Sequence, residues 1–213
     1  LGDDEVKVAV RNNFMWLFIV PTISTGIGLV AAVLADRVWW GTFAKTLIFM
    51  PMAISFVGAS VIWKFVYDLR PIDVDQIGLL NAILVKLGSE PMAWITIPFW
   101  NNFFLMIILI WIQTGFAMVI LSAALRGLSS EVIEASRMDG ASEFQIFYKI
   151  MIPQILSTIM VVWTTITIIV LKVFDIVVTM TNGQWDTGVL ANLMFNWMFV
   201  GGDFGRGSLI ALI

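Results

Sequence analysis

Two residue types that carry much of protein chemistry are missing, because the 213-residue sequence contains no cysteine and no histidine. Their absence excludes disulfides, thiol nucleophiles, histidine general bases and zinc sites built from those ligands. Charge is also scarce, since only 13% of the residues are charged, against about 25% in a soluble globular chain. The formal net charge of −3 gives no support for a basic surface that would bind nucleic acid.

Apolar residues dominate what is present. They make up 60% of the sequence, against about 45–50% in a soluble globular chain, and the mean hydropathy is +0.94. This composition indicates long apolar stretches rather than one buried core, so we predict an all-α fold, a polytopic membrane helical bundle. The sequence begins at Leu1 and ends inside the apolar run Ala211-Leu212-Ile213. We therefore interpret residues 1–213 as a single transmembrane domain that is truncated at both ends.

The apolar blocks are long enough to cross a membrane several times. A helix needs about 20 residues, at about 1.5 Å each, to cross about 30 Å of hydrocarbon. We predict four complete spans and the start of a fifth, at residues 14–35, 47–67, 103–125, 155–181 and 208–213. Pro51 is expected in the first turn of the second span, where its missing N–H costs little.

The segments between the spans are more polar. Residues 68–92 form a charged loop, in which one amphipathic stretch from Leu79 to Leu87 is expected to be helical. Residues 126–153 connect the third and fourth spans. Lysine and arginine set the orientation of a membrane protein, and here they divide five against five between the two sides. Charge alone therefore leaves the orientation open.

Local signals in residues 126–153 predict a short helix that ends in a sharp turn. Ser129 or Ser130 is placed to cap this helix, and Glu131 follows in the first turn, where the helix dipole favours an acid. Gly140 is placed to end the helix in the left-handed conformation. The helix would lie outside the bilayer, where a soluble partner has access to it.

A second helix is predicted directly after this turn. Ser142 and Gln145 have the spacing of a capping box, which favours a helix over residues 142–152. Pro153 then marks the start of the fourth span. The chain therefore leaves the membrane, forms a compact exposed helix, turns, and returns through a second helix.

The spacing in this loop resembles the signature of the integral-membrane permease subunits of binding-protein-dependent ABC importers. That signature reads E-A-A, three residues, G, nine residues, and I-x-L-P. The corresponding residues here are Glu134-Ala135-Ser136, Gly140 and Ile150-Met151-Ile152-Pro153, with Ser136 in place of Ala and Ile152 in place of Leu. The run Asp139-Gly140-Ala141 is common in the sugar-importer branch. Further segments look like carbohydrate permeases of the larger, maltose-type partner, and among those like alpha-glucoside permeases: Asn12–Trp16, Phe49–Pro51, Val173–Asp175 and Thr181–Gly183.

The resemblance implies an orientation, a location and a set of partners. It places residues 126–153 in the cytoplasm and residues 68–92 outside, in a multi-pass protein of the bacterial inner membrane. The implied partners are ABC ATPase subunits, a second homologous permease subunit, an extracytoplasmic sugar-binding protein and membrane lipid. No P-loop is found in the sequence, so ATP and Mg²⁺ would belong to the ATPase, with no cofactor on this chain.

The resemblance also implies a mechanism of alternating access. The ATPase would grip the short helix, and ATP-driven closure of the ATPase dimer would move the spans attached to it. An ordinary cytoplasmic loop with a capped helix is the simpler alternative. The residues expected to couple to the ATPase are Glu131, Glu134, Ala135, Ser136, Arg137, Asp139, Gly140, Ala141, Ile150 and Pro153.

Candidates for the sugar path come from the third and fourth spans. Sugars are bound by aromatic faces, which contact C–H surfaces, and by amides or carboxylates, which contact hydroxyls. The candidates are Trp111, Gln113, Phe116, Thr164, Thr165, Thr167, Lys172 and Asp175, with Asn192, Asn196 and Trp197 as weaker ones. Threonine in a membrane helix often bonds its own backbone instead, and tryptophan often only packs.

Lys172 and Asp175 are the only charges deep in a complete predicted span. Being three residues apart, they are expected to share a helix face and to form an internal pair. Such charges mark a pathway or a relay, or they fix helix packing. They also support an alternative function, an ion-coupled secondary transporter that uses this pair as its relay. A membrane enzyme is disfavoured, because no catalytic group or metal site is evident, and the identity of the sugar stays open.

Overall fold

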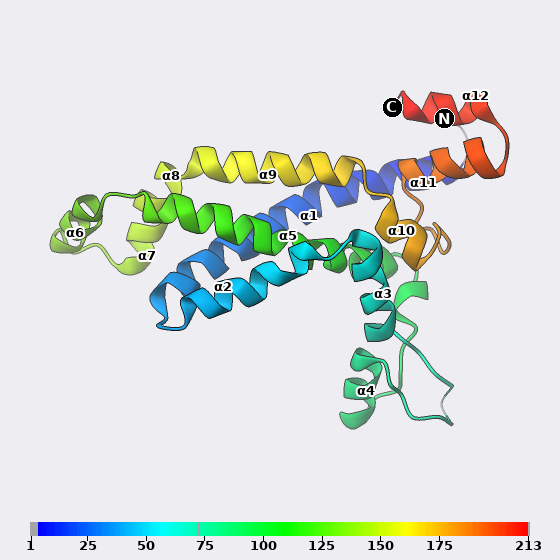
Figure 1. Ribbon diagram of the computed structural model, residues 1–213, viewed down its shortest axis with the longest axis horizontal. Coiled ribbons are helices and arrows are strands. Elements are labelled where there is room, and N and C mark those ends of the chain that lie inside the picture. The colour runs from blue at the N-terminus through cyan, green and yellow to red at the C-terminus, as the bar shows by residue number, and fades with distance from the viewer. Residues whose placement is uncertain (1–3, 72, 213) are drawn as a thin grey trace. The chain divides into compact units, whose positions relative to one another are not determined.

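Every regular element of the computed structural model is a helix, which confirms the predicted all-α class. The structure describes residues 4–71 and 73–212, and no strand occurs in these ranges. Leu1 and Ile213, the ends of the predicted domain, lie outside them. The elements in chain order are α1 Asp4–Arg37, α2 Gly41–Phe49, the 3-10 helix Met50–Ala53, α3 Phe56–Val66, α4 Leu79–Lys86, the 3-10 helix Trp94–Thr96, α5 Trp100–Arg126, α6 Ser130–Met138, α7 Glu143–Ile146, the π-helix Phe147–Met151, α8 Ile152–Gln154, α9 Leu156–Leu171, α10 Asp175–Met180, α11 Leu190–Phe195, the π-helix Asn196–Val200 and α12 Phe204–Ala211 (Figure 1).

The helices divide into two units. Unit 1 contains the described residues up to Val20, those of Ile54–Ile110 and those from Ile169 onward. Unit 2 contains Pro21–Ala53 and Trp111–Ile168. The long helices α1 and α5 each contribute residues to both units.

Unit 1 has a small apolar core between helices that are far apart in the sequence. Val6 and Ala9 of α1 pack with Leu193 of α11 and Ile210 of α12, and all four side chains are at least nine-tenths buried. The spacing of three between Val6 and Ala9 places both on one face of α1. Burying that face against α11 and α12 removes apolar surface from contact with water or headgroups.

Unit 2 is held together by helices that approach closely at glycine. A Cβ atom on Gly28 of α1 would lie 2.5 Å from the Cβ atom of Ala117 in α5. A Cβ atom on Gly115 of α5 would lie 2.5 Å from the carbonyl oxygen of Ile48 in α2. Small residues allow such close packing in membrane helices, where association depends on van der Waals contact rather than on expulsion of water.

Two predicted spans are single helices in the structure. The spans predicted at 14–35 and 103–125 lie inside α1 and α5, which extend beyond them at both ends. By length and composition, α1 and α5 are the two described helices able to cross a membrane alone. Two interrupted helix pairs raise that number to four if each pair is one span, so the count of four complete spans stays a prediction.

The second predicted span, 47–67, is not continuous, and the placement of Pro51 in its first turn is wrong. The helix begins earlier, at Gly41, and Pro51 lies in the 3-10 turn that ends this helix. Proline lacks the N–H that the preceding turn requires, so the α-helical ladder stops there. Ser55 then caps α3 by accepting a hydrogen bond from the N–H of Gly58 at 3.1 Å, which starts a new helix.

The fourth predicted span, 155–181, is also interrupted. Helix α9 ends at Leu171 and α10 begins at Asp175, with a short non-helical segment between them. Before α9, the run from Glu143 to Gln154 is helical, which confirms the second helix of the loop, and it meets α9 at a bend of 69°. Pro153 lies just before this bend, as expected for the start of the span. At the C-terminal end, α12 begins at Phe204, ahead of the predicted partial span 208–213.

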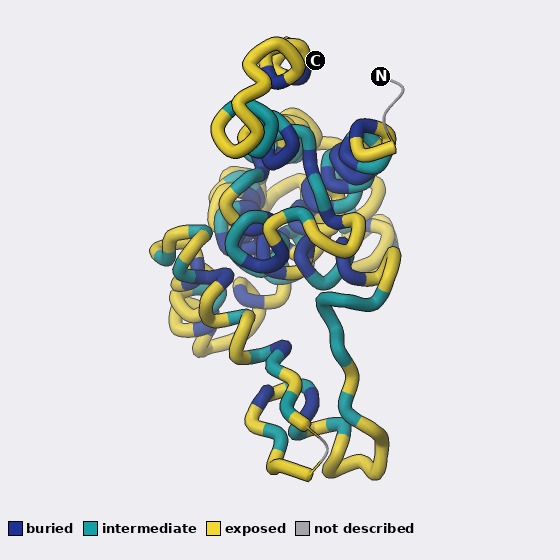
Figure 2. The backbone as a smooth tube through the Cα atoms, turned by 90° about the vertical axis from the view of Figure 1, so that its right-hand side faces the viewer, coloured by how far each residue is buried: buried dark blue, intermediate teal, exposed yellow. Residues whose placement is uncertain are grey.

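The loop at residues 68–92 carries α4, as predicted, and most of its described residues are exposed or half-buried (Figure 2). Gly78 and Asn81 are buried, and the Asn81 side chain organises the loop. The Asn81 amide donates to the carbonyl oxygens of Asp68 and Met92 at 2.8 and 3.1 Å. Its oxygen accepts from the N–H of Met92 and the indole N–H of Trp94 at 2.9 and 3.0 Å. One side chain thus closes the loop.

Candidate functional site

The short helix predicted between the third and fourth spans is present as α6, and the turn after it has the predicted geometry. Gly140 has φ +82°, the left-handed conformation that side chains disfavour. Ser129 occupies the N-cap position, but its side chain makes no capping hydrogen bond, so the expected cap is wrong in this detail. Ser142 and Gln145 form both hydrogen bonds of the predicted capping box and open α7.

An ion pair ties the two helices of this loop together. The Nε atom of Arg137, in α6, lies 2.8 Å from Oε1 of Glu143, the first residue of α7. This hydrogen bond lowers the pKa of the Glu143 carboxyl below its usual value, and it raises the pKa of Arg137. The spacing of three between Glu134 and Arg137 would also allow a pair within α6, whereas the structure joins Arg137 to Glu143. Both side chains are about half exposed.

The same carboxylate connects this loop to α1. A guanidinium nitrogen of Arg37, the last residue of α1, lies 3.2 Å from Oε2 of Glu143. Next to it, Asp36 bonds the Lys45 ammonium and the Arg126 guanidinium, at 2.6 and 3.1 Å. Ion pairs therefore connect the end of α1 with α2, with the end of α5 and with the start of α7. Sequence reasoning missed this network, because its members are between 9 and 106 positions apart.

Most residues expected to couple to an ATPase lie on the surface of unit 2. Those exposed are Glu131, Glu134, Ala135, Arg137, Asp139, Gly140 and Pro153, and those half-buried are Ser136, Ala141 and Ile150. The Ser136 hydroxyl donates to the carbonyl oxygen of Val132 at 2.6 Å, one turn back in α6. A polar residue at this position is thereby satisfied inside the helix, and the exposed face stays available to a partner.

In unit 1, the loop after α10 is held in an unusual backbone conformation. Three of its non-glycine residues, Asn182, Trp185 and Asp186, have positive φ, and Gly183 has φ +78°. Asparagine and aspartate tolerate this region, whereas tryptophan rarely adopts it, because its bulky side chain crowds the backbone. Such residues persist only where the surroundings fix them in place.

Buried asparagines provide that fixation. The Asn12 amide, in α1, donates to the carbonyl oxygens of Asp186 and Gly188, both at 2.8 Å. The Asn101 amide, at the start of α5, donates to the carbonyl oxygen of Trp185 at 2.6 Å. Asn12 and Asn101 are fully buried. A buried amide that meets a buried carbonyl satisfies both groups, whereas either one alone would be costly.

Two further asparagines extend this clamp, which we define as Asn12, Asn13, Asn101 and Asn102. Asn13 accepts a hydrogen bond from the N–H of Leu190 at 2.8 Å, and Asn102 donates to the carbonyl oxygen of Asp186 at 3.3 Å. No local pattern connects Asn101 and Asn102 with the loop after α10. The available signal was a pair of adjacent asparagines directly before each of two apolar blocks.

The sugar-path candidates of α5 and α9 lie in unit 2. Gln113 is buried, and its Oε1 atom has no hydrogen-bond partner among the described residues. Trp111 and Phe116 are half-buried. The Thr167 hydroxyl donates to the carbonyl oxygen of Trp163 at 2.8 Å, which is the backbone bond expected of a structural threonine. The side-chain oxygen of Gln113 is therefore left to accept a hydrogen bond, whereas the hydroxyl proton of Thr167 is already donated to the backbone.

Lys172 and Asp175 do not form the expected pair. Lys172 follows the end of α9, and Asp175 is the first residue of α10, so the two do not share a helix face. No ion pair joins them in the part of the chain that the structure describes, and both side chains are exposed in unit 1. The interruption between α9 and α10 separates what a continuous helix would have brought together.

Comparison with known proteins identifies several relatives. The sequence model of the family described as "Binding-protein-dependent transport system inner membrane component" matches residues 24–213. The alpha-glucoside transport system permease protein AglF of Rhizobium meliloti is 70% identical over the whole chain, which spans 64% of that protein's length. The osmoprotective compounds uptake permease protein GgtC of Synechocystis is 56% identical over 99% of the chain and 76% of that protein.

A solved structure shares the fold at low sequence identity. A chain in the crystal structure of a bacterial alginate ABC transporter, in complex with its alginate pentasaccharide-bound periplasmic protein, matches with a TM-score of 0.87. The two sequences are 18% identical, and the match covers 99% of this chain and 73% of that chain. At this identity the likeness establishes the helical architecture alone.

Proposed function

Because the chain belongs to the family of binding-protein-dependent transport system inner membrane components, we propose that it is a permease subunit of an ATP-driven carbohydrate importer. The observation that carries this proposal is the 70% identity to an alpha-glucoside permease over the full length of the chain. We accordingly propose an alpha-glucoside or a related oligosaccharide as the substrate. The chain itself performs no catalysis in this role, and ATP is hydrolysed on a separate ATPase subunit.

The proposed partners follow from the same relatives. They are ABC ATPase subunits, a second homologous permease, and an extracytoplasmic sugar-binding protein that delivers the substrate. In this arrangement residues 126–153 face the cytoplasm, and the loop that carries α4 faces the outside. Alternating access would come from movement of the spans as the ATPases close and open.

The geometry supports a specific route for that movement. An ATPase that grips α6 acts on a helix whose Arg137 is bonded to Glu143, and Glu143 is bonded to Arg37 of α1. The positive φ of Gly140 allows the sharp turn by which α7 follows closely after α6. A push on the short helix is therefore passed both to the return helix and to α1.

The sugar-path proposal keeps some candidates and weakens others. Gln113 is buried and has an unmet acceptor, which supports a polar contact in the path. Thr167 already bonds its own backbone, so we give it no substrate contact. Lys172 and Asp175 remain exposed charges without a mutual bond, and a relay between them, as an ion-coupled transporter would need, has no geometric support.

Co-purification tests this proposal. The complete subunit is tagged in its native membrane and extracted gently, and the associated proteins are identified by mass spectrometry. We expect an ABC ATPase and a second permease, both lost when residues 134–140 are scrambled in a protein that still inserts. Recovery of the chain alone, together with proton- or sodium-driven sugar uptake in vesicles, would overturn the importer and restore the ion-coupled alternative.

A further inference from the structure

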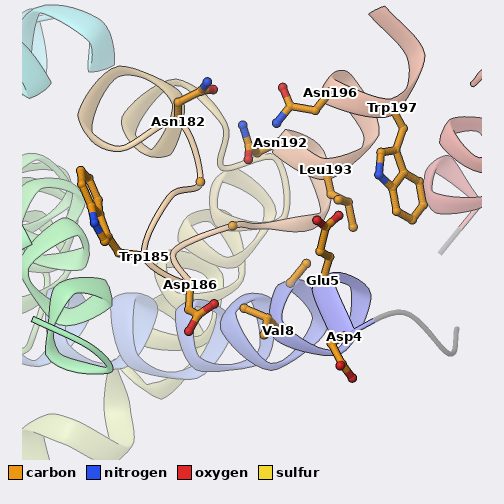
Figure 3. A pocket seen from close by; sticks show the side chains of 13 residues that line it. Asp4, Glu5, Val8, Asn182, Trp185, Asp186, Asn192, Leu193, Asn196 and Trp197 are labelled. Carbon is orange, nitrogen blue, oxygen red and sulfur yellow. The ribbon is translucent and has the colours of Figure 1, made fainter. Parts of the chain in front are cut away.

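Unit 1 contains a cavity beside the loop that follows α10. Its volume is about 550 Å³, within the range of small-molecule sites. It lies between the start of α1, the loop after α10 and the segment from α11 into the following π-helix. Glu5 and Val8 project from α1 toward the segment that carries Asn192 and Leu193 (Figure 3).

The wall of this cavity holds a buried polar group with unmet bonding capacity. Asn192 is 3% exposed, and its amide nitrogen has no hydrogen-bond partner among the described residues. Burying an amide donor without a partner costs roughly 1–3 kcal/mol, so such groups are retained where something else satisfies them. A ligand oxygen at the cavity wall would do so. The adjacent Gly183 leaves room for the Asn192 side chain, since a Cβ atom there would lie 2.2 Å from its oxygen.

The side chains that line the cavity indicate which class of ligand would fit it. Two more amides, of Asn182 and Asn196, and two indoles, of Trp185 and Trp197, accompany Asn192. Three carboxylates contribute acceptors, and no lysine or arginine lines the cavity. Amides and carboxylates bond hydroxyl groups, and indole faces contact the C–H surfaces of a sugar ring. An anionic ligand would meet repulsion.

A metal ion is a poor alternative occupant. The described residues contain no group of three or more acidic side chains placed to hold one. Asp4, one of the lining carboxylates, is already paired with Lys7 at 2.9 Å. A neutral, hydroxyl-rich molecule is the class that the lining fits best.

The clamp defined above fixes part of this wall. It bonds the carbonyl oxygens of Trp185 and Asp186, and these two residues line the cavity in a strained conformation. Strain of this kind is maintained where it aims side chains at a function. Three of the clamp asparagines, Asn12, Asn101 and Asn102, thus fix the backbone that carries the indole and the carboxylate of the cavity.

We propose that this cavity is a sugar-binding vestibule on the extracytoplasmic side, where a neutral di- or oligosaccharide is held before it enters the membrane path. The inference rests on the proposed function for the side of the membrane and for the substrate class. Asn192 would donate to a sugar hydroxyl, Glu5 and Asp186 would accept from others, and Trp185 would stack on a ring.

The absence of cysteine from this sequence allows a direct test by thiol protection. Asn196→Cys is placed in the cavity wall, and Phe199→Cys, on the same π-helix but outside the lining, is the matched control. The complete importer is kept in right-side-out vesicles, and labelling by a charged, membrane-impermeant methanethiosulfonate is timed. Maltose, sucrose and trehalose serve as probes, and uptake of each sugar is measured in parallel.

We expect a transported disaccharide to slow labelling of Asn196→Cys about fivefold or more and to leave Phe199→Cys unchanged. Adding Asn192→Asp, which keeps the shape but removes the donor, should raise the half-protecting sugar concentration about threefold to tenfold. Equal labelling with and without a sugar that is taken up would overturn the vestibule and leave the importer standing. So would an unreactive Asn196→Cys beside a reactive Phe199→Cys, because the cavity would then be closed in the whole protein. If none of the sugars is taken up but one protects, the vestibule stands and the proposed transport function fails.

Discussion

The carboxylate of Glu143 lies 3.2 Å from the guanidinium of Arg37, although the two residues are 106 positions apart in the chain. Its other oxygen bonds Arg137. One acidic side chain therefore joins the end of α1, the short helix α6 and the start of α7. In the proposed importer, these contacts make the exposed loop a mechanical part of the bundle rather than a free docking peptide.

Neutralising this carboxylate should impair coupling more than folding. Because both ion pairs of Glu143 are exposed, Glu143→Gln is expected to leave membrane insertion and Tm nearly unchanged. The link from α6 to α1 is weakened, so sugar uptake per ATP hydrolysed should fall severalfold. The two rates are measured in parallel in vesicles that contain the complete importer. The control is Glu90→Gln, an exposed carboxylate in the loop that carries α4, and an equal loss in both variants would contradict the role of Glu143.

The pH dependence of this link follows from the direction of the shift. The hydrogen bond from Arg137 lowers the pKa of Glu143 below its ordinary value of 4.5. A lowered carboxyl pKa means that the contribution to stability is present above pH 4.5 and is lost as the pH falls through the lower, folded-state pKa. Coupling should therefore be independent of this group at neutral pH. A drop in the coupling ratio between pH 8 and 6 that Glu143→Gln abolishes would contradict the assignment.

Gly140 provides a graded test of the turn. A Cβ atom at this position would meet nothing within 4 Å, so only its positive φ opposes a side chain. Asparagine tolerates this conformation, alanine less so, and valine least. We expect uptake to be retained in Gly140→Asn, reduced in Gly140→Ala and lost in Gly140→Val, with normal insertion in all three. If Gly140→Val transports at the normal rate, the turn is not needed for coupling.

The sequence predicted those parts of the fold that depend on neighbouring residues. The left-handed Gly140, the capping box at Ser142 and the helix α4 all follow from signals within a few positions, and all are present. The interruptions of the second and fourth spans were not predicted, because apolar composition is the same for a continuous and a broken helix. Only Pro51 marked the first break, and it was assigned to a first turn instead.

Long-range polar contacts could not be predicted from the sequence. Asn12 meets Asp186 and Gly188 across 174 and 176 positions, and no local pattern connects them. The same holds for the pair of Lys172 and Asp175, whose separation depends on where α9 ends. The vestibule lining combines residues from the two ends of the sequence, so its existence depends on the packing of α1 against α11.

The asparagine clamp should contribute measurably to stability. Asn12→Leu removes an amide that donates to the carbonyl oxygens of Asp186 and Gly188 at 2.8 Å each, so Gly188 loses this donor and Asp186 keeps only the 3.3 Å bond from Asn102. We expect the free energy of unfolding to fall by about 2 kcal/mol or more. Thermal unfolding of the purified protein in detergent measures this as a lower Tm. Asn196→Ala, which lacks such contacts, is the control, and equal Tm values for the two variants would show that the clamp is not stabilising.

The close approach of α5 to α2 gives the last prediction, and the chain supplies its own control. In Gly115→Ala the new Cβ atom would lie 2.5 Å from the carbonyl oxygen of Ile48 and 2.9 Å from the Cα atom of Phe49, both backbone atoms that cannot rotate away. The helices must separate, and overpacking of this kind costs roughly 1–3 kcal/mol. Gly26→Ala, in α1, meets nothing within 4 Å, and alanine favours a helix over glycine by about 1 kcal/mol. We therefore expect Tm to fall for Gly115→Ala and to stay equal or rise for Gly26→Ala. A fall of the same size in both would mean that glycine acts there through helix flexibility rather than through close packing.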